Sequence, residues 1–296
     1  MSINSKTKGI GVFLAIAFGL SWSYWAILWL AGVSTNSLLW QFWLLPGAFA
    51  PALACLIVRR WVTREGFADV GHRLNLRSHW GYYLFAWLSP LAVTAVIVLL
   101  ALGLNISQPD FSLQQFFQTY VPQADAAAIP DHVLIIATWG TLIQAVLVAT
   151  PVVWGEEFGW RGYLQLRLFA QHPLKAAIAT GLIWGVWHAP LTLMGYEQYE
   201  NPILGLLIFP VFTVWLSIIF GWLRLKTQSL WAVCLAHGAT NAIGASLTLM
   251  LFGGGTNWTW VGYNGILAWI PLGAISMWIV CSDRLPRSIS LQDHVN

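Results

Sequence analysis

The chain has 296 residues, of which 58% are hydrophobic and only 8% are charged. A water-soluble domain needs more surface charge than this to stay dissolved and monomeric, so the composition excludes an ordinary soluble protein. It predicts an all-α integral membrane protein, with room for about seven to nine helices of about twenty residues each.

Eight apolar segments are long enough to cross about 30 Å of hydrocarbon at about 1.5 Å per residue. No internal repeat or flexible linker separates them, so we expect one membrane domain over residues 1–296. The first segment follows two lysines, as a secretory signal would, but its length and the lack of a small-residue cleavage site favour a retained anchor. The expected spans are Ile10–Ala31, Leu39–Val58, Trp80–Leu104, His132–Gly155, Leu174–Gly195, Ile203–Leu223, Ser229–Phe252 and Gly262–Cys281.

The 14 Lys and Arg residues all fall in connections on one side of the expected membrane. The positive-inside rule therefore places both termini in the cytoplasm, which requires an even number of spans. The net charge of +3 reflects this topology, so we expect membrane lipids as partners and no nucleic acid. The loops on the opposite side contain no basic residue, and their acidic residues are Asp110, Asp125, Asp131, Glu197 and Glu200.

Two connections are long enough to have structure of their own. The basic cytoplasmic loop Arg59–His79 either rests against anionic headgroups or simply joins two spans. The outer loop Asn105–Asp131 contains Phe111, Phe116 and Phe117, and either forms a short interfacial helix or is a plain connection.

The three cysteines lie in apolar segments and show no paired spacing. They are Cys55, Cys234 and Cys281. This placement is typical of packing residues and disfavours a disulfide framework or a thiol nucleophile.

A pair of glutamates, Glu156 and Glu157, ends the fourth apolar segment. If the segment is helical, Glu157 and Arg161 are four residues apart and can pair, while Glu156 faces the bundle interior. An ionisable group within a span costs several kcal/mol unless it is paired or used, so these residues are candidates for function. The alternative is a charged helix end at the cytoplasmic interface.

A histidine, His188, lies well inside the fifth apolar segment. Pro190 follows it and would weaken the local backbone hydrogen bonds, which is a common way to open a helix around a site. A plain structural role, in which the ring bonds a neighbouring helix, is the alternative.

The seventh segment has His237 and Asn241 on one helical face, one turn apart. The intervening Gly238 also suits close helix packing, which is the alternative interpretation. For Glu156 to reach these side chains, the helix of the fourth segment must continue through Gln165 or beyond, with a bend expected at Pro151.

These motifs resemble those of the CPBP family of intramembrane proteases, also called the Abi family, which includes type II CAAX prenyl endopeptidases and bacteriocin-processing or immunity proteins. The family shows Glu-Glu-x-x-x-Arg, aromatic-x-x-x-His and His-x-x-x-Asn on successive helices, as found here at 156–161, 184–188 and 237–241. The resemblance covers roughly Ala137–Met250, and it departs at Trp184, where phenylalanine is commoner. The family's eight-helix architecture agrees with the number of apolar segments.

The resemblance implies a hydrolase that cleaves a peptide bond of a membrane-bound or lipidated, prenylated CAAX-type substrate. Glu156 would activate water as a general base, with His188 helping to position it. His237 and Asn241 would hydrogen-bond the carbonyl oxygen as negative charge develops. The candidate catalytic residues are Glu156, Glu157, Arg161, His188, His237 and Asn241.

A metalloprotease mechanism remains open at this point. Glu156, His188 and His237 would make a two-histidine, one-glutamate zinc set with water in the fourth position. The metal-free mechanism uses the same residues directly, and we favour it, assigning no cofactor.

Two other functions use the same polar residues. A proton-coupled transporter could use them as a relay, and a non-catalytic immunity or scaffold protein could use them to hold helices together. Other intramembrane proteases fit poorly, because the chain has no His-Glu-x-x-His, no Gly-x-Ser-Gly and no aspartate within a span. The expected location is the cytoplasmic membrane of a bacterial or archaeal cell.

Overall fold

The computed structural model describes residues 3–33, 40–120, 129–130, 132–253 and 257–285, and all regular elements in these ranges are helical. The expected all-α class is therefore confirmed. Several predictions concern positions outside the described residues, namely the start of the second span at Leu39 and the residues Asp125, Asp131 and Arg287.

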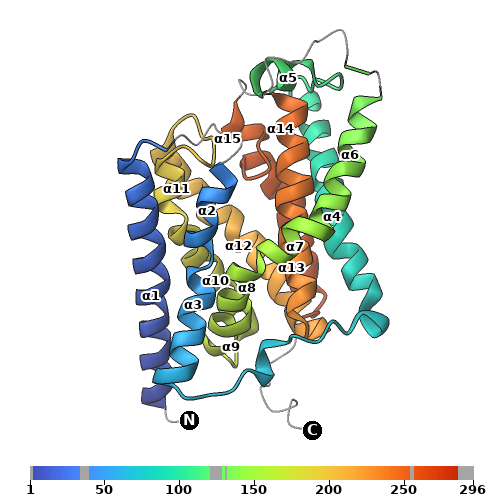
Figure 1. Cartoon of the computed structure of the whole chain (residues 1–296). Coiled ribbons are helices and arrows are strands. Elements are labelled where there is room, and N and C mark those ends of the chain that lie inside the picture. The colour runs from blue at the N-terminus through green and yellow to red at the C-terminus, as the bar shows by residue number, and fades with distance from the viewer. Residues whose placement is uncertain (1–2, 34–39, 121–128, 131, 254–256, 286–296) are drawn as a thin grey trace.

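Long apolar helices dominate the chain (Figure 1). Within the described residues, seven are long and apolar enough to cross a membrane. The α-helices are α1 (Ile3–Leu30), α2 (Trp40–Ala48), α3 (Ala50–Ile57), α4 (Leu76–Gly103), α5 (Gln114–Tyr120), α6 (Val133–Gln144), α7 (Thr150–Val152), α8 (Trp154–Gly159), α9 (Gln165–Arg167), α10 (Pro173–Trp187), α11 (Ala189–Leu193), α12 (Pro202–Thr227), α13 (Leu230–Ala239), α14 (Ser246–Phe252), α15 (Trp258–Val261) and α16 (Trp269–Cys281).

The expected fifth span is divided in two, which is why it does not appear among the seven continuous helices. Helix α10 ends at Trp187, and α11 begins at Ala189, with His188 between them. Pro190 has no backbone N–H to donate and is tolerated in the first turn of a helix, so it fits near the start of α11 but could not continue α10. The break expected around His188 is therefore present.

The fourth expected span also extends as the site requires. The helical path runs from α6 through the π-helical turn η4 (Ala145–Ala149) to α7, pauses at Val153, and resumes in α8. It then continues through the π-helical turn η5 (Trp160–Leu164) and α9 to Arg167. The interruption falls two residues after Pro151, close to the expected bend.

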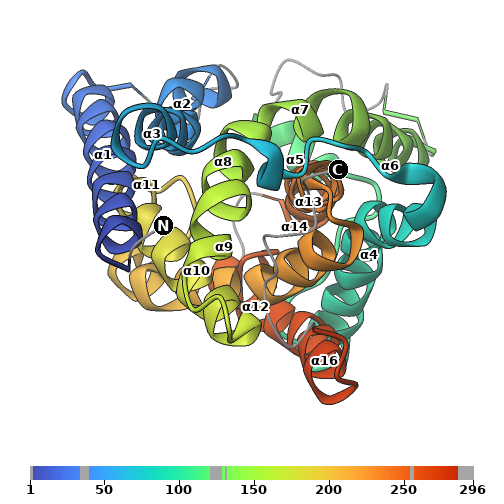
Figure 2. The same cartoon turned by 90° about the horizontal axis from the view of Figure 1, so that it is seen from below.

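This interrupted path occupies the middle of the bundle. Viewed from below, α8 lies between α3 on one side and α13 on the other (Figure 2), and it packs against both. Close approach depends on small residues: a Cβ on Gly159 would lie 2.5 Å from Pro51 of α3, and one on Gly238 of α13 would lie 2.7 Å from the backbone of Thr150. The packing role considered for Gly238 is thus real and compatible with a site beside it.

Basic residues from three different connections meet at one end of the bundle. Arg59 and Arg167 form ion pairs with Asp69 at 2.8 and 3.1 Å, and Arg224 donates to the carbonyl oxygen of Asp69. These arginines come from connections that the charge pattern places on the same side of the membrane. The arrangement therefore agrees with the predicted sidedness.

The loop 59–79 is fastened to the bundle. The backbone N–H of Leu230 donates to Gly71 at 2.7 Å, and the Asn75 amide donates to Thr227 at 3.0 Å. At the other end of the molecule, the outer loop forms the short helix α5, as one of the two interpretations expected. Contact of either loop with lipid stays a prediction.

The cysteines are free thiols. Cys55 and Cys234 are buried in the packed interior, as expected, whereas Cys281 is exposed at the end of α16. No pair of them forms a disulfide within the part of the chain that the structure describes.

Candidate active site

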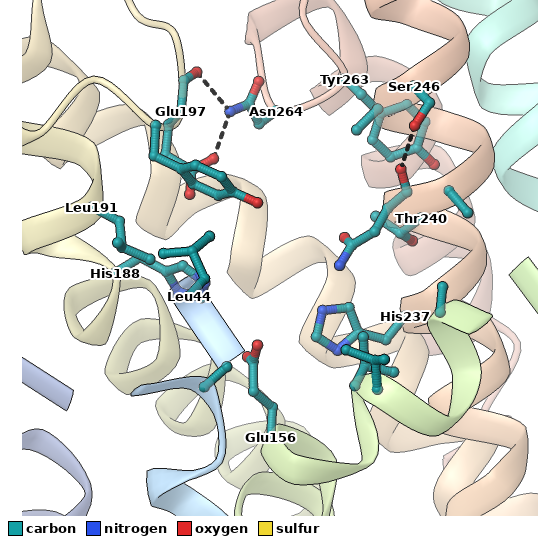
Figure 3. A pocket seen from close by; sticks show the side chains of 18 of the residues that line it. Leu44, Glu156, His188, Leu191, Glu197, His237, Thr240, Ser246, Tyr263 and Asn264 are labelled. Carbon is teal, nitrogen blue, oxygen red and sulfur yellow. Dashed lines mark hydrogen bonds between the residues drawn. The ribbon is translucent and has the colours of Figure 1, made fainter. Parts of the chain in front are cut away.

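One cavity of about 620 Å³ is lined by four of the six candidate catalytic residues. Glu156, His188, His237 and Asn241 all line it, although they come from three separate helical segments. Figure 3 shows Glu156 below, with the imidazoles of His188 and His237 on opposite sides of the same space. His188 lies at the break between α10 and α11, and Asn241 lies in a π-helical turn, an irregularity that is frequent at functional sites.

Trp184 holds the Glu156 carboxylate in place. Its indole Nε1 donates to Oε2 of Glu156 at 2.8 Å, which joins α10 to α8. The sequence interpretation counted Trp184 only as an aromatic residue. A hydrogen-bond partner for Trp184 could nevertheless have been expected from the sequence, since a buried indole N–H usually needs an acceptor and Trp184 lies deep in an apolar segment.

Glu157 is fully buried and serves two partners. Its Oε1 accepts hydrogen bonds from Arg161 Nη1 at 2.8 Å and from His237 Nδ1 at 2.8 Å. The expected pair between Glu157 and Arg161 is therefore present, and the contact with His237 was not foreseen. Through it, a residue of α8 fixes the ring orientation of a residue of α13.

The Arg161 guanidinium is enclosed by aromatic rings. It lies 4.5 Å from the ring centroid of Trp184 and 5.1 Å from that of Phe220. These cation–π contacts and the carboxylate of Glu157 partly compensate for removing a charge from water. Arg161 does not line the cavity, so its place in the site is to support Glu157.

The helix break at His188 also determines how its ring is held. The backbone N–H of His188 bonds to Gly185, which leaves the carbonyl of Trp184 without its usual helical donor. Nδ1 of His188 lies 2.9 Å from that carbonyl oxygen and supplies the missing hydrogen bond. With a proton on Nδ1, the neutral ring has its Nε2 free to accept a hydrogen bond.

Asn241 stands one turn beyond His237, at the start of the π-helical turn η6 (Thr240–Ala245). Its side chain is exposed toward the cavity, whereas the His237 ring is only 4% exposed. The site thus combines a carboxylate, an imidazole with a free acceptor nitrogen, an imidazole bonded to a carboxylate, and an amide.

A catalytic zinc ion needs three protein ligands that converge on one point. Within the described residues, no group of three His, Cys, Asp or Glu side chains is arranged to hold a metal. Glu156, His188 and His237 line one cavity, but each points in from a different wall. They do not fit a zinc set in this arrangement, and we derive no step through a metal.

Comparison with known proteins gives two findings. Residues 138–243 match the model of a family described as type II CAAX prenyl endopeptidase Rce1-like. Over 220 residues the chain is 28% identical to CAAX prenyl protease 2 of Methanococcus maripaludis, an alignment that covers 68% of this chain and 72% of the relative. The matched segment contains all six candidate catalytic residues, from Glu156 to Asn241.

Proposed function

We propose that the chain is a membrane peptidase of the Rce1-like type II CAAX prenyl endopeptidase family, whose model matches residues 138–243, and that it hydrolyses its substrate with water activated by Glu156. One observation carries the proposal: a carboxylate, two imidazoles and an amide from separate helices face one cavity. Peptide hydrolysis needs a base, a held water and donors aimed at the developing oxyanion, and these groups can supply all three.

Glu156 is prepared to act as the base. One carboxylate oxygen, Oε2, is held by Trp184, which leaves Oε1 to accept a proton from water. Nε2 of His188 accepts the second hydrogen of the same water and orients its lone pair toward the substrate carbonyl. The oxygen–carbon bond forms as the proton moves to Glu156.

The tetrahedral intermediate then carries a negative oxygen. The Nδ2 amide of Asn241 donates to it, and Nε2 of His237 donates when the ring carries a second proton. The carboxylate of Glu157 at Nδ1 stabilises that imidazolium form. When the intermediate collapses, the carbon–nitrogen bond breaks and Glu156 returns its proton to the leaving amine.

The substrate is a membrane-associated protein or peptide, and a prenylated CAAX-type tail is the first class to test. The relative's name, CAAX prenyl protease 2, supports this choice. The positive-inside pattern supports approach from the cytoplasmic leaflet, with the enzyme in the cytoplasmic membrane of a bacterial or archaeal cell.

The test compares purified wild type with Glu156→Ala on a quenched CAAX-type peptide, with and without its prenyl group, and on a small peptide library. Mass spectrometry locates the cleaved bond. We expect turnover by wild type and loss of at least about a thousandfold in the variant, the size typical for removal of a catalytic base. Equal turnover by both proteins would reject the role of Glu156, and no turnover by wild type on any peptide would reject the function.

A further inference from the structure

The far end of the cavity carries a second carboxylate, Glu197, which no step above uses. Glu197 lies in the segment between α11 and α12 and lines the same cavity as Glu156. Figure 3 shows it with Asn264 at the opposite end of the cavity from Glu156, beyond the level of His188 and His237. A substrate segment that passes Glu156 therefore has room to extend toward Glu197.

Glu197 is held in position by a neighbouring segment. The Asn264 amide donates to Oε2 of Glu197 at 3.0 Å and to its backbone carbonyl at 3.1 Å. Tyr199 donates its hydroxyl to the carbonyl of Asn264 at 2.8 Å, and Glu200 accepts the backbone N–H of Thr259 at 3.1 Å. The loop that carries Glu197 is thus fastened on both sides, so its carboxylate is preorganised.

The charge of this carboxylate is not compensated within the cavity. Among the described residues, those that line the cavity include Glu156 and Glu197 and no lysine or arginine. Burial, and to a lesser extent the charge of Glu156, raise the pKa of Glu197 to about 8, although the hydrogen bond from Asn264 opposes this. A carboxylate in such surroundings binds a cation strongly, because the cation supplies the missing counter-charge.

We propose that Glu197 is a specificity-determining residue that binds a cationic group of the substrate, an ammonium or a guanidinium, a few residues from the scissile bond. The proposal rests on the peptidase function proposed above. It also means that an acidic group at the same place in the substrate is disfavoured, since it would meet a carboxylate with no basic residue nearby.

The experiment uses peptides that differ at one residue. Lys, Met or Glu is placed in turn at each of the three positions on either side of the cleaved bond, and kcat/KM is measured for wild type, Glu197→Gln and Glu200→Gln. The Gln side chain at 197 can still accept the hydrogen bond from Asn264, so this variant removes the charge and keeps the loop contact. Glu200 is in the same loop but does not line the cavity, and a Gln at 200 can still accept the hydrogen bond from Thr259, so Glu200→Gln is the control for removing a charge from this loop outside the cavity.

At about pH 9, where the Glu197 carboxyl is mostly ionised, wild type and Glu200→Gln should prefer Lys over Met at one position by about tenfold or more, the effect of one charge-assisted contact. Glu197→Gln should bring that ratio close to one. An unchanged ratio in Glu197→Gln, in a wild type that cleaves and depends on Glu156, would overturn the inference and leave the proposed function standing. A preference for the Glu peptide in both wild type and Glu197→Gln would also overturn it. Residue 197 would then act as a neutral hydrogen-bond donor, a role that both a protonated carboxyl and the Gln amide can fill. Failure of wild type to cleave any peptide would instead reject the proposed function.

Discussion

The indole of Trp184 and the carboxylate of Glu156 form a hydrogen bond of 2.8 Å between two helices, and this bond leaves only one carboxylate oxygen free. The contact gives the general base a fixed orientation before the substrate arrives. Preorganisation of this kind lowers the barrier because no rearrangement is needed during the reaction.

Trp184→Phe should keep the aromatic packing and remove the donor. We expect kcat to fall about tenfold with little change in KM, since a lost hydrogen bond to a charged group is worth about 1.5 to 3 kcal/mol and part of the orientation remains. Steady-state kinetics on the reporter peptide measures the effect. Trp222→Phe is the control, because Trp222 is also buried but does not line the cavity; equal kcat for the two variants would contradict the positioning role.

The Trp184 contact also shows where inference from sequence stops. The lengths of the apolar segments, the break near Pro190 and the pair between Glu157 and Arg161 depend on residues close in the chain, and these were predicted. The bonds from Trp184 to Glu156 and from His237 to Glu157 join different helices, and no spacing rule reports them.

Glu197 was expected in a connection between two spans and lies between α11 and α12, but its position at the end of the cavity was not expected. That position depends on Asn264, more than sixty residues later in the chain, and only the folded arrangement brings the two together. A carboxylate without a basic neighbour could have been suspected from the charge pattern, since the loops expected on that side contain no Lys or Arg.

Glu157→Met should be strongly destabilising, because it leaves the Arg161 guanidinium buried without a counter-charge. The expected loss is about 3 to 5 kcal/mol in the free energy of unfolding. The double variant Glu157→Met/Arg161→Met should recover most of that stability and remain inactive, since His237 still lacks the carboxylate that holds its ring. Thermal unfolding in detergent and peptide hydrolysis are measured on the same samples, and an active double variant would show that Glu157 has only a structural role.

Asp69 should make the arginine cluster at one end of the bundle, formed by Arg59, Arg167 and Arg224, sensitive to acid. Burial alone would raise its pKa, but the hydrogen bond and charge of Arg59 outweigh burial and lower it. A carboxyl group with a lowered pKa in the folded state stabilises the protein above its unfolded pKa of about 3.9, and this contribution is lost as the pH falls through the folded value. Asp69→Asn should therefore lower Tm at pH 7, and the difference from wild type should shrink below about pH 4. The exposed Asp283→Asn is the control, and an equal Tm change in both variants would argue against the arginine cluster.

The preference for a cationic substrate should depend on pH. Because the pKa of Glu197 is raised to about 8, its carboxyl is mostly neutral below that pH and ionised above it. The Lys-to-Met ratio of kcat/KM should therefore rise between pH 6.5 and 9 in wild type and stay flat in Glu197→Gln. Glu156, His188 and His237 face the same cavity, but they act on both peptides alike, so their effects cancel in the ratio. A flat ratio in wild type would contradict the prediction.

Removal of divalent metal should leave the activity intact. The described residues hold no metal-binding group of three His, Cys, Asp or Glu side chains. Hydrolysis is measured after dialysis against a chelator and again after zinc is added back. Loss of activity that zinc restores would show that the site rearranges to bind metal.

The central claim is that Glu156 and His237 act on one bond in one cavity, and single-turnover hydrolysis by Glu156→Gln, His237→Ala and the double variant tests it most directly. The effects of substituting residues that act as a unit do not add, so each single variant should lose about a thousandfold or more in the rate of hydrolysis. The double variant should be little slower than the slower single variant. A single variant that hydrolyses the peptide at the wild-type rate would contradict the account.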